Sequence, residues 1–242
     1  MYPFFSKKGQ RGIVKRGLFA YYNALRQYST NQVGQRLIDF SGNNYRGQSG
    51  SVPVSDPNDP IFTSQGLSFD GVDDYINVGN IGKLMRTCQI VFYTPTEINK
   101  TSSSSALISI EGNDNGYIAI GLTTSLIADE IITILDISGG RSGWCSSSGN
   151  IPIGWHLLEV VWLDSKYRII LDGIEKPITT ANAPRVLNAT NLRLGSVPSG
   201  GSYFNGKQAE ILLYERTLTN SELAQNRAFI KAECKNYGIT IN

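Results

Sequence analysis

The chain has 242 residues, a formal net charge of +2, 40% hydrophobic residues and 17% charged residues. This composition excludes a disordered chain, and three widely separated cysteines exclude a disulfide framework and a paired-cysteine zinc site. The 25 glycines, with many Ser, Thr and Asn, are typical of short strands and frequent turns, and this length is compatible with a single domain.

Residues 1–16 contain five basic residues and no acid, whereas the remaining 17 basic and 20 acidic residues leave the body at minus three. We expect a flexible basic arm over residues 1–16 and one folded domain over residues 17–242. The arm either solubilises the chain or docks onto an acidic protein surface, and nucleic acid is a disfavoured partner. The docking residues would be Tyr2, Phe4, Phe5, Lys7, Lys8, Arg11, Lys15 and Arg16.

The first residues lack the apolar run that follows the charges of a secretory signal, and no later stretch resembles a membrane span. We therefore expect a soluble protein with no secretion signal of its own.

In chain order, the first predicted strand is Leu18 to Tyr22, followed by a cluster of turn-forming residues from Asp39 to Asn44. The prolines at positions 53, 57 and 60 predict a long loop that lasts until Leu67.

Residues 66–79 predict one tight β-corner that joins two strands. Leu67 and Phe69 are two positions apart and share a face, Asp70 precedes a turn-forming glycine, and a second alternating run begins at Tyr75. Three carboxylates lie within this corner, so it is the first place to look for a functional site.

Alternating segments predict further short strands, which favour two packed antiparallel sheets. They are Gln89 to Tyr93, Ala106 to Ile110, Tyr117 to Leu122, Ile131 to Ile137, Leu157 to Leu163, Tyr167 to Leu171, Asn191 to Leu194 and Lys207 to Tyr214. One helix is expected over about residues 220–237, because Thr219 to Glu222 fits a capping box and Gly238 fits a C-terminal cap.

The corner sequence Gly-Leu-Ser-Phe-Asp-Gly-Val-Asp-Asp-Tyr-Ile resembles the opening motif of laminin-G-like, concanavalin A-like lectin/glucanase jelly-roll modules. Three further segments agree in order: residues 17–44, 155–173 and 204–223. The resemblance covers roughly residues 17 to 235 and implies an all-β, two-sheet antiparallel jelly-roll sandwich with one C-terminal helix. One departure is Ala209, where the closing strand of relatives usually carries an Asp.

The resemblance also implies a possible Ca²⁺ site to which Asp70, Asp73 and Asp74 would contribute. Ca²⁺ needs six to eight oxygen ligands, and three carboxylates provide only part of that shell. The alternative is structural: Asp70 and Asp73 would stabilise the turn through backbone N–H groups, and Asp74 would stay solvated.

Glycan binding usually needs exposed aromatic rings and planar polar groups on loops. The best candidates are Trp144 and Arg141, which lie in a predicted loop at residues 138–149, and then Tyr203. Alternatively, these aromatic side chains fold back onto the sandwich or meet a neighbouring subunit.

Catalysis is disfavoured because glycoside hydrolysis needs two facing carboxyl groups. Glu159 and Asp164 are separated by an odd number of positions, as are Glu210 and Glu215, so each pair faces opposite ways on a regular strand. His156, the only histidine, is expected to be structural. The sequence therefore predicts a protein that is not an enzyme.

These features lead to three functional hypotheses. The first is a virion component, a capsid decoration or tail-associated protein made in the host cytoplasm, whose jelly roll binds glycans or cell surfaces and whose arm docks onto the particle. The second is a carbohydrate-binding or adhesion module of an extracellular or cell-surface system. The third is a glycoside hydrolase, because one fold carries many functions.

Overall fold

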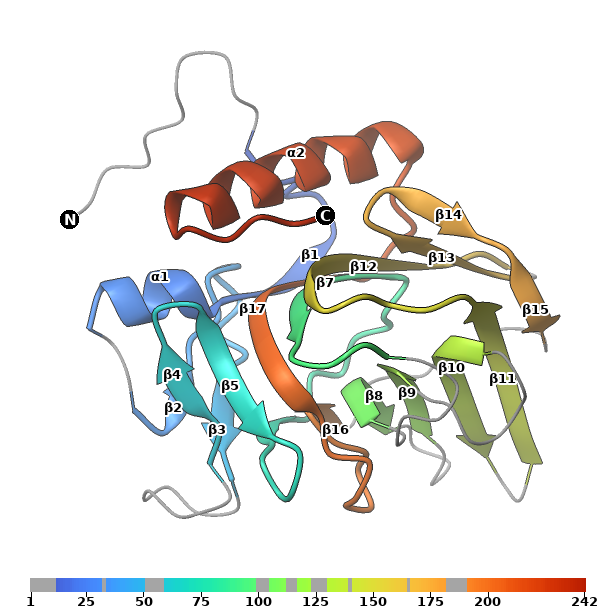
Figure 1. Cartoon of the computed structure of the whole chain (residues 1–242), viewed down its shortest axis with the longest axis horizontal. Helices are drawn as coiled ribbons and strands as arrows, with labels where there is room; N and C mark the ends of the chain where they lie inside the picture. Colours follow the sequence, from blue (N-terminus) through green and yellow to red (C-terminus); the bar gives the residue numbers. More distant parts are fainter. Residues whose placement is uncertain are drawn as a thin grey trace.

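The computed structural model describes residues 12–31, 34–50, 59–98, 105–111, 117–122, 130–138, 141–164, 166–181 and 191–242. Within these ranges the chain forms an eight-stranded and a nine-stranded antiparallel sheet, packed face to face (Figure 1). The predicted two-sheet sandwich with a C-terminal helix is confirmed. No helix in the described ranges is long and apolar enough to cross a membrane.

The first sheet has strand order β14-β13-β12-β7-β17-β5-β4, and β1 also pairs with β17. Its strands are β1 (Leu18–Asn23), β4 (Ile61–Thr63), β5 (Gly66–Asp70), β7 (Thr87–Thr94), β12 (Gly154–Trp162), β13 (Tyr167–Leu171), β14 (Ile174–Lys176) and β17 (Asn205–Tyr214).

The second sheet has strand order β15-β11-β10-β9-β8-β16-β6-β3-β2. Its strands are β2 (Arg36–Leu37), β3 (Gly47–Ser49), β6 (Ile76–Gly79), β8 (Ser105–Glu111), β9 (Tyr117–Leu122), β10 (Glu130–Ser138), β11 (Arg141–Ser148), β15 (Ile178–Ala181) and β16 (Asn191–Leu194).

The main core lies between the two sheets, because alternate residues of each strand point inward. Phe92 and Trp162 from the first sheet are buried in one cluster with Ile108, Ile120 and Leu194 from the second. This alternation leaves the other residues of the second sheet on its outer face.

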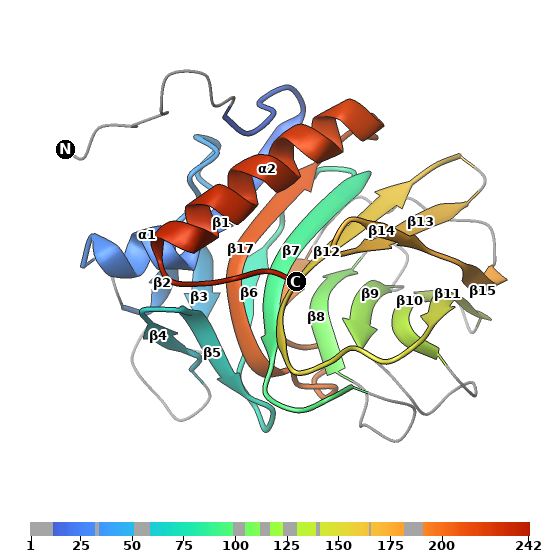
Figure 2. The ribbon, with the colours of Figure 1, turned by 45° about the horizontal axis from the view of Figure 1, so that its top comes forward.

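Helix α2 (Asn220–Asn236) covers the outer face of the first sheet (Figure 2). The predicted capping box is present, since Thr219 and Glu222 bond reciprocally, and Gly238 has a φ of +74° just after the helix. Leu223 and Ile230 are buried against this sheet. The short helix α1 (Ala24–Ser29), which the sequence analysis missed, contacts the same sheet.

The N-terminal boundary differs from the prediction. Ile13 and Val14 are buried in the cluster beneath α2. The backbone N–H of Val14 donates to Asn226 Oδ1 (2.8 Å), and the Tyr214 hydroxyl donates to the Val14 carbonyl (3.0 Å). Residues 13–16 therefore belong to the folded body, in which the predicted docking residues Lys15 and Arg16 are exposed.

The predicted docking residues that precede position 12 lie outside the described residues. They are Tyr2, Phe4, Phe5, Lys7, Lys8 and Arg11.

The corner at residues 66–79 connects the two sheets instead of joining neighbouring strands. Strand β5 pairs with β17 and β4 in the first sheet, whereas β6 pairs with β16 and β3 in the second. Leu67 and Phe69 are both buried, as their spacing predicts. The corner is thus a crossover that holds the acidic turn at one edge of the sandwich.

Candidate functional site

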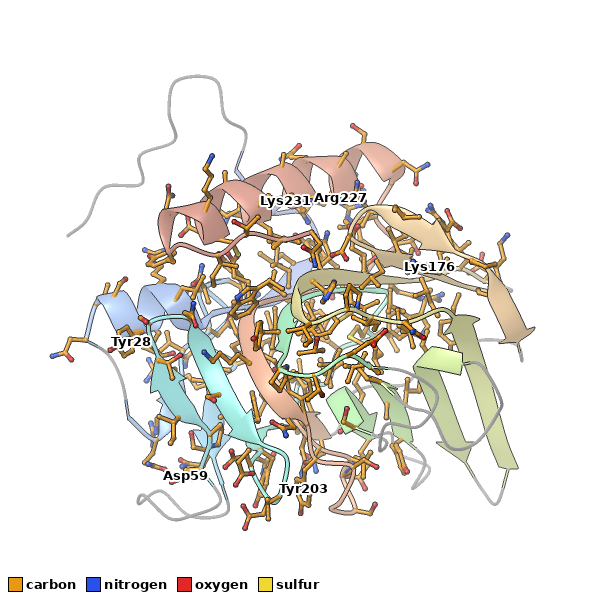
Figure 3. All side chains as sticks on the ribbon, in the orientation of Figure 1. Tyr28, Asp59, Lys176, Tyr203, Arg227 and Lys231 are labelled. Carbon is orange, nitrogen blue, oxygen red and sulfur yellow. The ribbon has the colours of Figure 1, made fainter. Side chains whose placement is uncertain are left out.

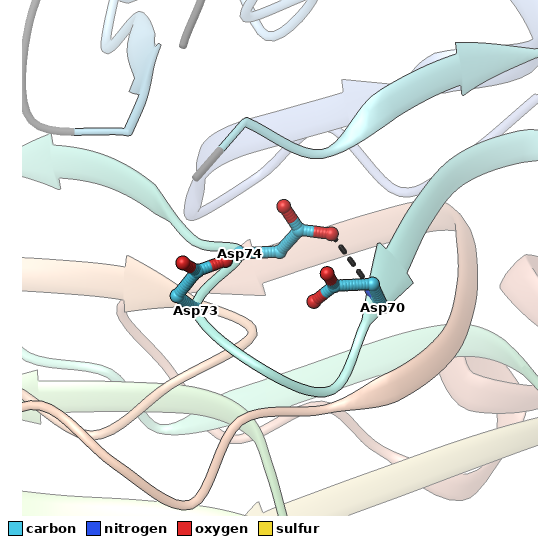
Figure 4. A group of neighbouring side chains, drawn as sticks. All are labelled: Asp70, Asp73 and Asp74. Carbon is cyan, nitrogen blue, oxygen red and sulfur yellow. Dashed lines mark hydrogen bonds between the residues drawn. The ribbon is translucent and has the colours of Figure 1, made fainter. Parts of the chain in front are cut away.

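Three carboxylates, Asp70, Asp73 and Asp74, lie together in the turn between β5 and β6 (Figure 4). One ligand oxygen from each lies within 4.8 Å of the others. The Asp70 backbone N–H donates to Asp74 Oδ2 (2.7 Å), and the N–H of Val72 donates to Asp70 Oδ1 (2.8 Å). Two of the three carboxylates therefore accept hydrogen bonds from backbone N–H groups of the turn.

The burial order of the cluster is the reverse of the prediction. Asp74, expected to be solvated, is 4% exposed, whereas Asp70 is exposed and Asp73 is partly exposed. Burial raises the pKa of Asp74 to about 6, and the negative charges of Asp70 and Asp73 add to the increase. Ile76, two positions after Asp74, is buried in the core between the sheets.

The cluster can hold a metal ion, because carboxylate oxygens are the ligands that hard cations prefer. A divalent cation would favour the ionised form of Asp74 and relieve the repulsion among the three groups. The three side chains supply fewer oxygens than the six to eight of a Ca²⁺ shell, so backbone carbonyls or water would have to complete it.

A second group of polar and aromatic residues lies on the outer face of the nine-stranded sheet. Direct cross-strand partners point to the same face of a sheet. Asn77 of β6 pairs with Arg193 of β16, and Arg193 pairs with Ser109 of β8. Leu192 and Leu194, on either side of Arg193, are buried in the core. Asn77 and Arg193 therefore point away from the core.

The row continues across the sheet to the candidate tryptophan. Ser109 pairs with Ala119 of β9, Ala119 with Leu135 of β10, and Leu135 with Trp144 of β11. Four strand spacings separate the backbone of Arg193 from that of Trp144, a span of about 19 Å. We call the positions from Asn77 to Trp144 the outer row.

The candidate glycan residues are not brought to one place. Trp144 and Arg141 belong to β11 instead of a loop, because pairing with β10 and β15 fixes this serine-rich segment. The side chains of Trp144 and Arg141 are outside the described residues. Tyr203 is partly buried in the loop before β17, far from α2 (Figure 3). That loop contacts β8, since Ala106 N–H donates to Ser202 O.

The carboxylates considered for catalysis have other partners or face solvent. Glu159 is fully buried beneath α2 and accepts hydrogen bonds from Gln89 (2.7 Å) and Arg227 (2.9 Å). The Asp164 side chain is fully exposed. Burial raises the pKa of Glu210 to about 8.

His156 is buried, and its ring nitrogens contact Asp172 Oδ2 and the Pro152 carbonyl, both at 2.8 Å. Both ring nitrogens therefore already have partners within the fold. This arrangement fits the structural role that the sequence analysis expected of the histidine.

Three residues of the outer face were not predicted from the sequence: Arg193, Tyr75 and Asn77. A local signal exists for the first, because the alternation Asn191-Leu192-Arg193-Leu194 places two polar residues opposite two apolar ones. Tyr75 approaches Arg193 only through the pairing of β6 with β16. That contact spans 118 positions and has no local signature.

A model of the concanavalin A-like lectin/glucanases superfamily matches residues 70–224. No curated protein sequence gives a significant match to the chain.

Two solved structures show the similarity of fold. Domain 4 of an extracellular GH43 arabinanase from Geobacillus stearothermophilus, in complex with arabinotriose, has a TM-score of 0.60 at 17% identity, covering 87% of this chain and 98% of that chain. Trypanosoma rangeli sialidase in complex with sialic acid has a TM-score of 0.60 at 12% identity. The similarity covers 92% of this chain and 34% of the sialidase, so this chain spans about a third of that protein's length.

Proposed function

Because the chain belongs to the concanavalin A-like lectin/glucanases superfamily, we propose that it is a carbohydrate-binding domain without catalytic activity. The outer row carries this proposal. Both helices of the described ranges contact the first sheet, which leaves no described helix over the outer face of the second. The loop after β16 covers Ser109 and Ala119 in the middle of the row, so the end at Arg193 and the end at Trp144 would contact a ligand separately.

The comparison with arabinanase domain 4 supports a binding function, because the similarity covers nearly all of that domain and its structure holds arabinotriose. None of the comparisons supports the virion setting, so the hypothesis of a carbohydrate-binding module takes precedence. Docking through the N-terminal arm stays a prediction.

The proposal of a domain without catalytic activity is supported by the acids themselves. Glu159 is bonded to α2, Asp164 faces solvent, and Glu215 pairs with Lys83 (2.8 Å). We therefore expect the chain to cleave no oligosaccharide of a test panel. Chromatography of the incubated sugars would detect any cleavage.

A glycan array with the whole chain tests the proposed function. We expect binding to at least one oligosaccharide and expect Trp144→Ala to weaken it roughly tenfold or more, since aromatic rings stack on sugars and Trp144 is the aromatic candidate whose backbone belongs to the outer row. Tyr28→Ala, which changes an exposed aromatic residue on α1, is the matched control and should leave binding within about twofold. Absence of binding to every glycan would contradict the proposal.

A further inference from the structure

Arg193 is a cation with no carboxylate partner among the described residues. Its guanidinium carbon lies 5.0 Å from the centre of the Tyr75 ring, and the residue is partly exposed on the outer face. Its Nε is buried without an acceptor, and no hydrogen bond or ion pair joins the guanidinium to another residue in the described part of the chain. A guanidinium stays protonated, so its charge persists at every physiological pH.

Two amide side chains on the same face also have unfilled hydrogen-bonding capacity. Asn77 pairs directly with Arg193 across the strands, and Asn191 lies two positions before it. The Oδ1 atom of each is buried and has no donor among the described residues. The Asn191 amide Nδ2 donates to Glu111 (3.1 Å), which orients that side chain. Unpartnered buried acceptors cost about 1–3 kcal/mol each, and hydroxyl groups or water would satisfy them.

We propose that this part of the outer row binds an acidic sugar, and that the guanidinium of Arg193 pairs with its carboxylate or sulfate group. The inference rests on the proposed carbohydrate-binding function. A planar guanidinium suits an oxyanion because two N–H groups can donate in parallel. The Tyr75 ring attracts the guanidinium through a cation–π contact, while Asn77 and Asn191 would accept from sugar hydroxyls.

Attraction by the body as a whole cannot explain such selectivity. Residues 12–242, which include Lys15 and Arg16, carry 19 basic and 20 acidic side chains, a net charge of minus one. A polyanion therefore gains no net attraction from the average surface of the body. Binding of an acidic sugar would depend on the local pairing with Arg193, so one substitution should weaken it strongly.

Affinity electrophoresis in native gels tests this proposal with the full chain. The gels contain polygalacturonate as a carboxylate polymer, dextran sulfate as a sulfate polymer, or dextran and arabinan as neutral polymers. We expect retardation by one acidic polymer, and Arg193→Met should raise its dissociation constant at least tenfold. Lys235→Met removes the same charge from an exposed position on helix α2 and should change the dissociation constant less than twofold.

Thermal unfolding distinguishes a ligand-binding role for Arg193 from a structural one. Arg193→Met should keep or raise the midpoint, because the substitution removes a buried unpartnered donor. Equal retardation of the wild type and Arg193→Met by the acidic polymers would overturn the inference. Retardation by neutral polymers alone would overturn the inference and leave the proposed function standing. The absence of retardation in every gel would contradict both.

Discussion

In the acidic corner, one buried carboxylate makes the stability of the fold depend on pH. Asp74 has a pKa of about 6 in the folded chain and about 3.8 when unfolded, so the folded state binds its proton more tightly. Its contribution to stability is therefore complete below pH 4 and is lost as the pH rises through 6. This sign is opposite to that of a salt-bridged carboxylate.

Asp74→Asn removes this titration but keeps a carbonyl oxygen to accept the Asp70 N–H. Between pH 4 and pH 7, we expect the free energy of unfolding of the variant to increase by about 1 kcal/mol relative to that of wild type, allowing for solvent screening. Urea denaturation at both pH values measures the difference. Asp73→Asn removes one carboxylate of the same cluster and is the control. If the free energies of unfolding of Asp74→Asn and wild type differed by the same amount at both pH values, the raised pKa of Asp74 would be contradicted.

The same variants separate a metal site from a structural turn. A bound cation favours ionised carboxylates, so Ca²⁺ would raise the unfolding midpoint of the wild type at pH 7 and a chelator would reverse the increase. Asp73→Asn would abolish that response. A midpoint that is the same in Ca²⁺ and in chelator would leave the corner with a structural role only.

At the scale of elements, α2 is attached to the first sheet by a buried ion pair as well as by apolar packing. Arg227 Nε donates to Glu159 Oε2 (2.9 Å), and Glu159 on β12 is fully buried. Burial raises the pKa of Glu159, an increase that its bonds to Arg227 and Gln89 oppose. Figure 3 shows Arg227 on α2, above the sheet that carries β12.

Arg227→Met should destabilise the fold by about 3 kcal/mol, because it leaves a buried carboxylate without its cation. Glu159→Gln combined with Arg227→Met should recover much of that loss, since the carboxylate is then gone. A double-mutant cycle by urea denaturation measures the coupling. Additive losses would show that the two side chains act independently.

Strands with clean alternation could be predicted from the sequence, and elements fixed by distant partners could not. β9, β13 and β16 match their predicted bounds, because inward-facing apolar residues alternate there with outward-facing ones. β11 is rich in serine and glycine and becomes a strand through pairing with β10. Helix α1 has only six residues and depends on the Asn23 cap and the buried Gln27.

The features of the candidate site also divide into those that a local sequence pattern predicts and those that depend on distant partners. Adjacent positions revealed the acidic corner, but the burial of Asp74 depends on the crossover between sheets, which no local pattern specifies. The outer row joins β6, β16, β8, β9, β10 and β11, strands that are far apart in the chain. Trp144 was found by residue type alone, whereas Arg193 required the register of the sheet.

At the scale of the whole molecule, the two ends of the chain complete the fold together. β1 pairs with β17, and Val14 bonds to Asn226 and Tyr214, which lie at least 200 positions away. Ile241 forms a bridge with Trp155, so the C-terminal segment also lies against the first sheet. The stability of the sandwich therefore depends on residues that precede β1.

This closure decides how a docking function of the N-terminal arm must be tested. Deleting residues 2–16 would remove Ile13 and Val14, uncover part of the cluster beneath α2 and take away the backbone N–H that donates to Asn226 Oδ1. We expect that variant to be about 3 kcal/mol less stable than a variant lacking only residues 2–11, from lost apolar burial and the two buried hydrogen bonds of Val14. Urea denaturation of both variants measures the difference.

Only the shorter deletion separates docking from folding, because it retains the contacts of Ile13 and Val14. A docking arm predicts that loss of residues 2–11 abolishes association with a partner while the unfolding midpoint stays at the wild-type value. Equal stability of the two deletion variants would show instead that residues 12–16 contribute nothing to the fold, contrary to the burial of Ile13 and Val14. Gly12 and Val14 are part of the fold, since side chains of α2 and β17 bind their backbone.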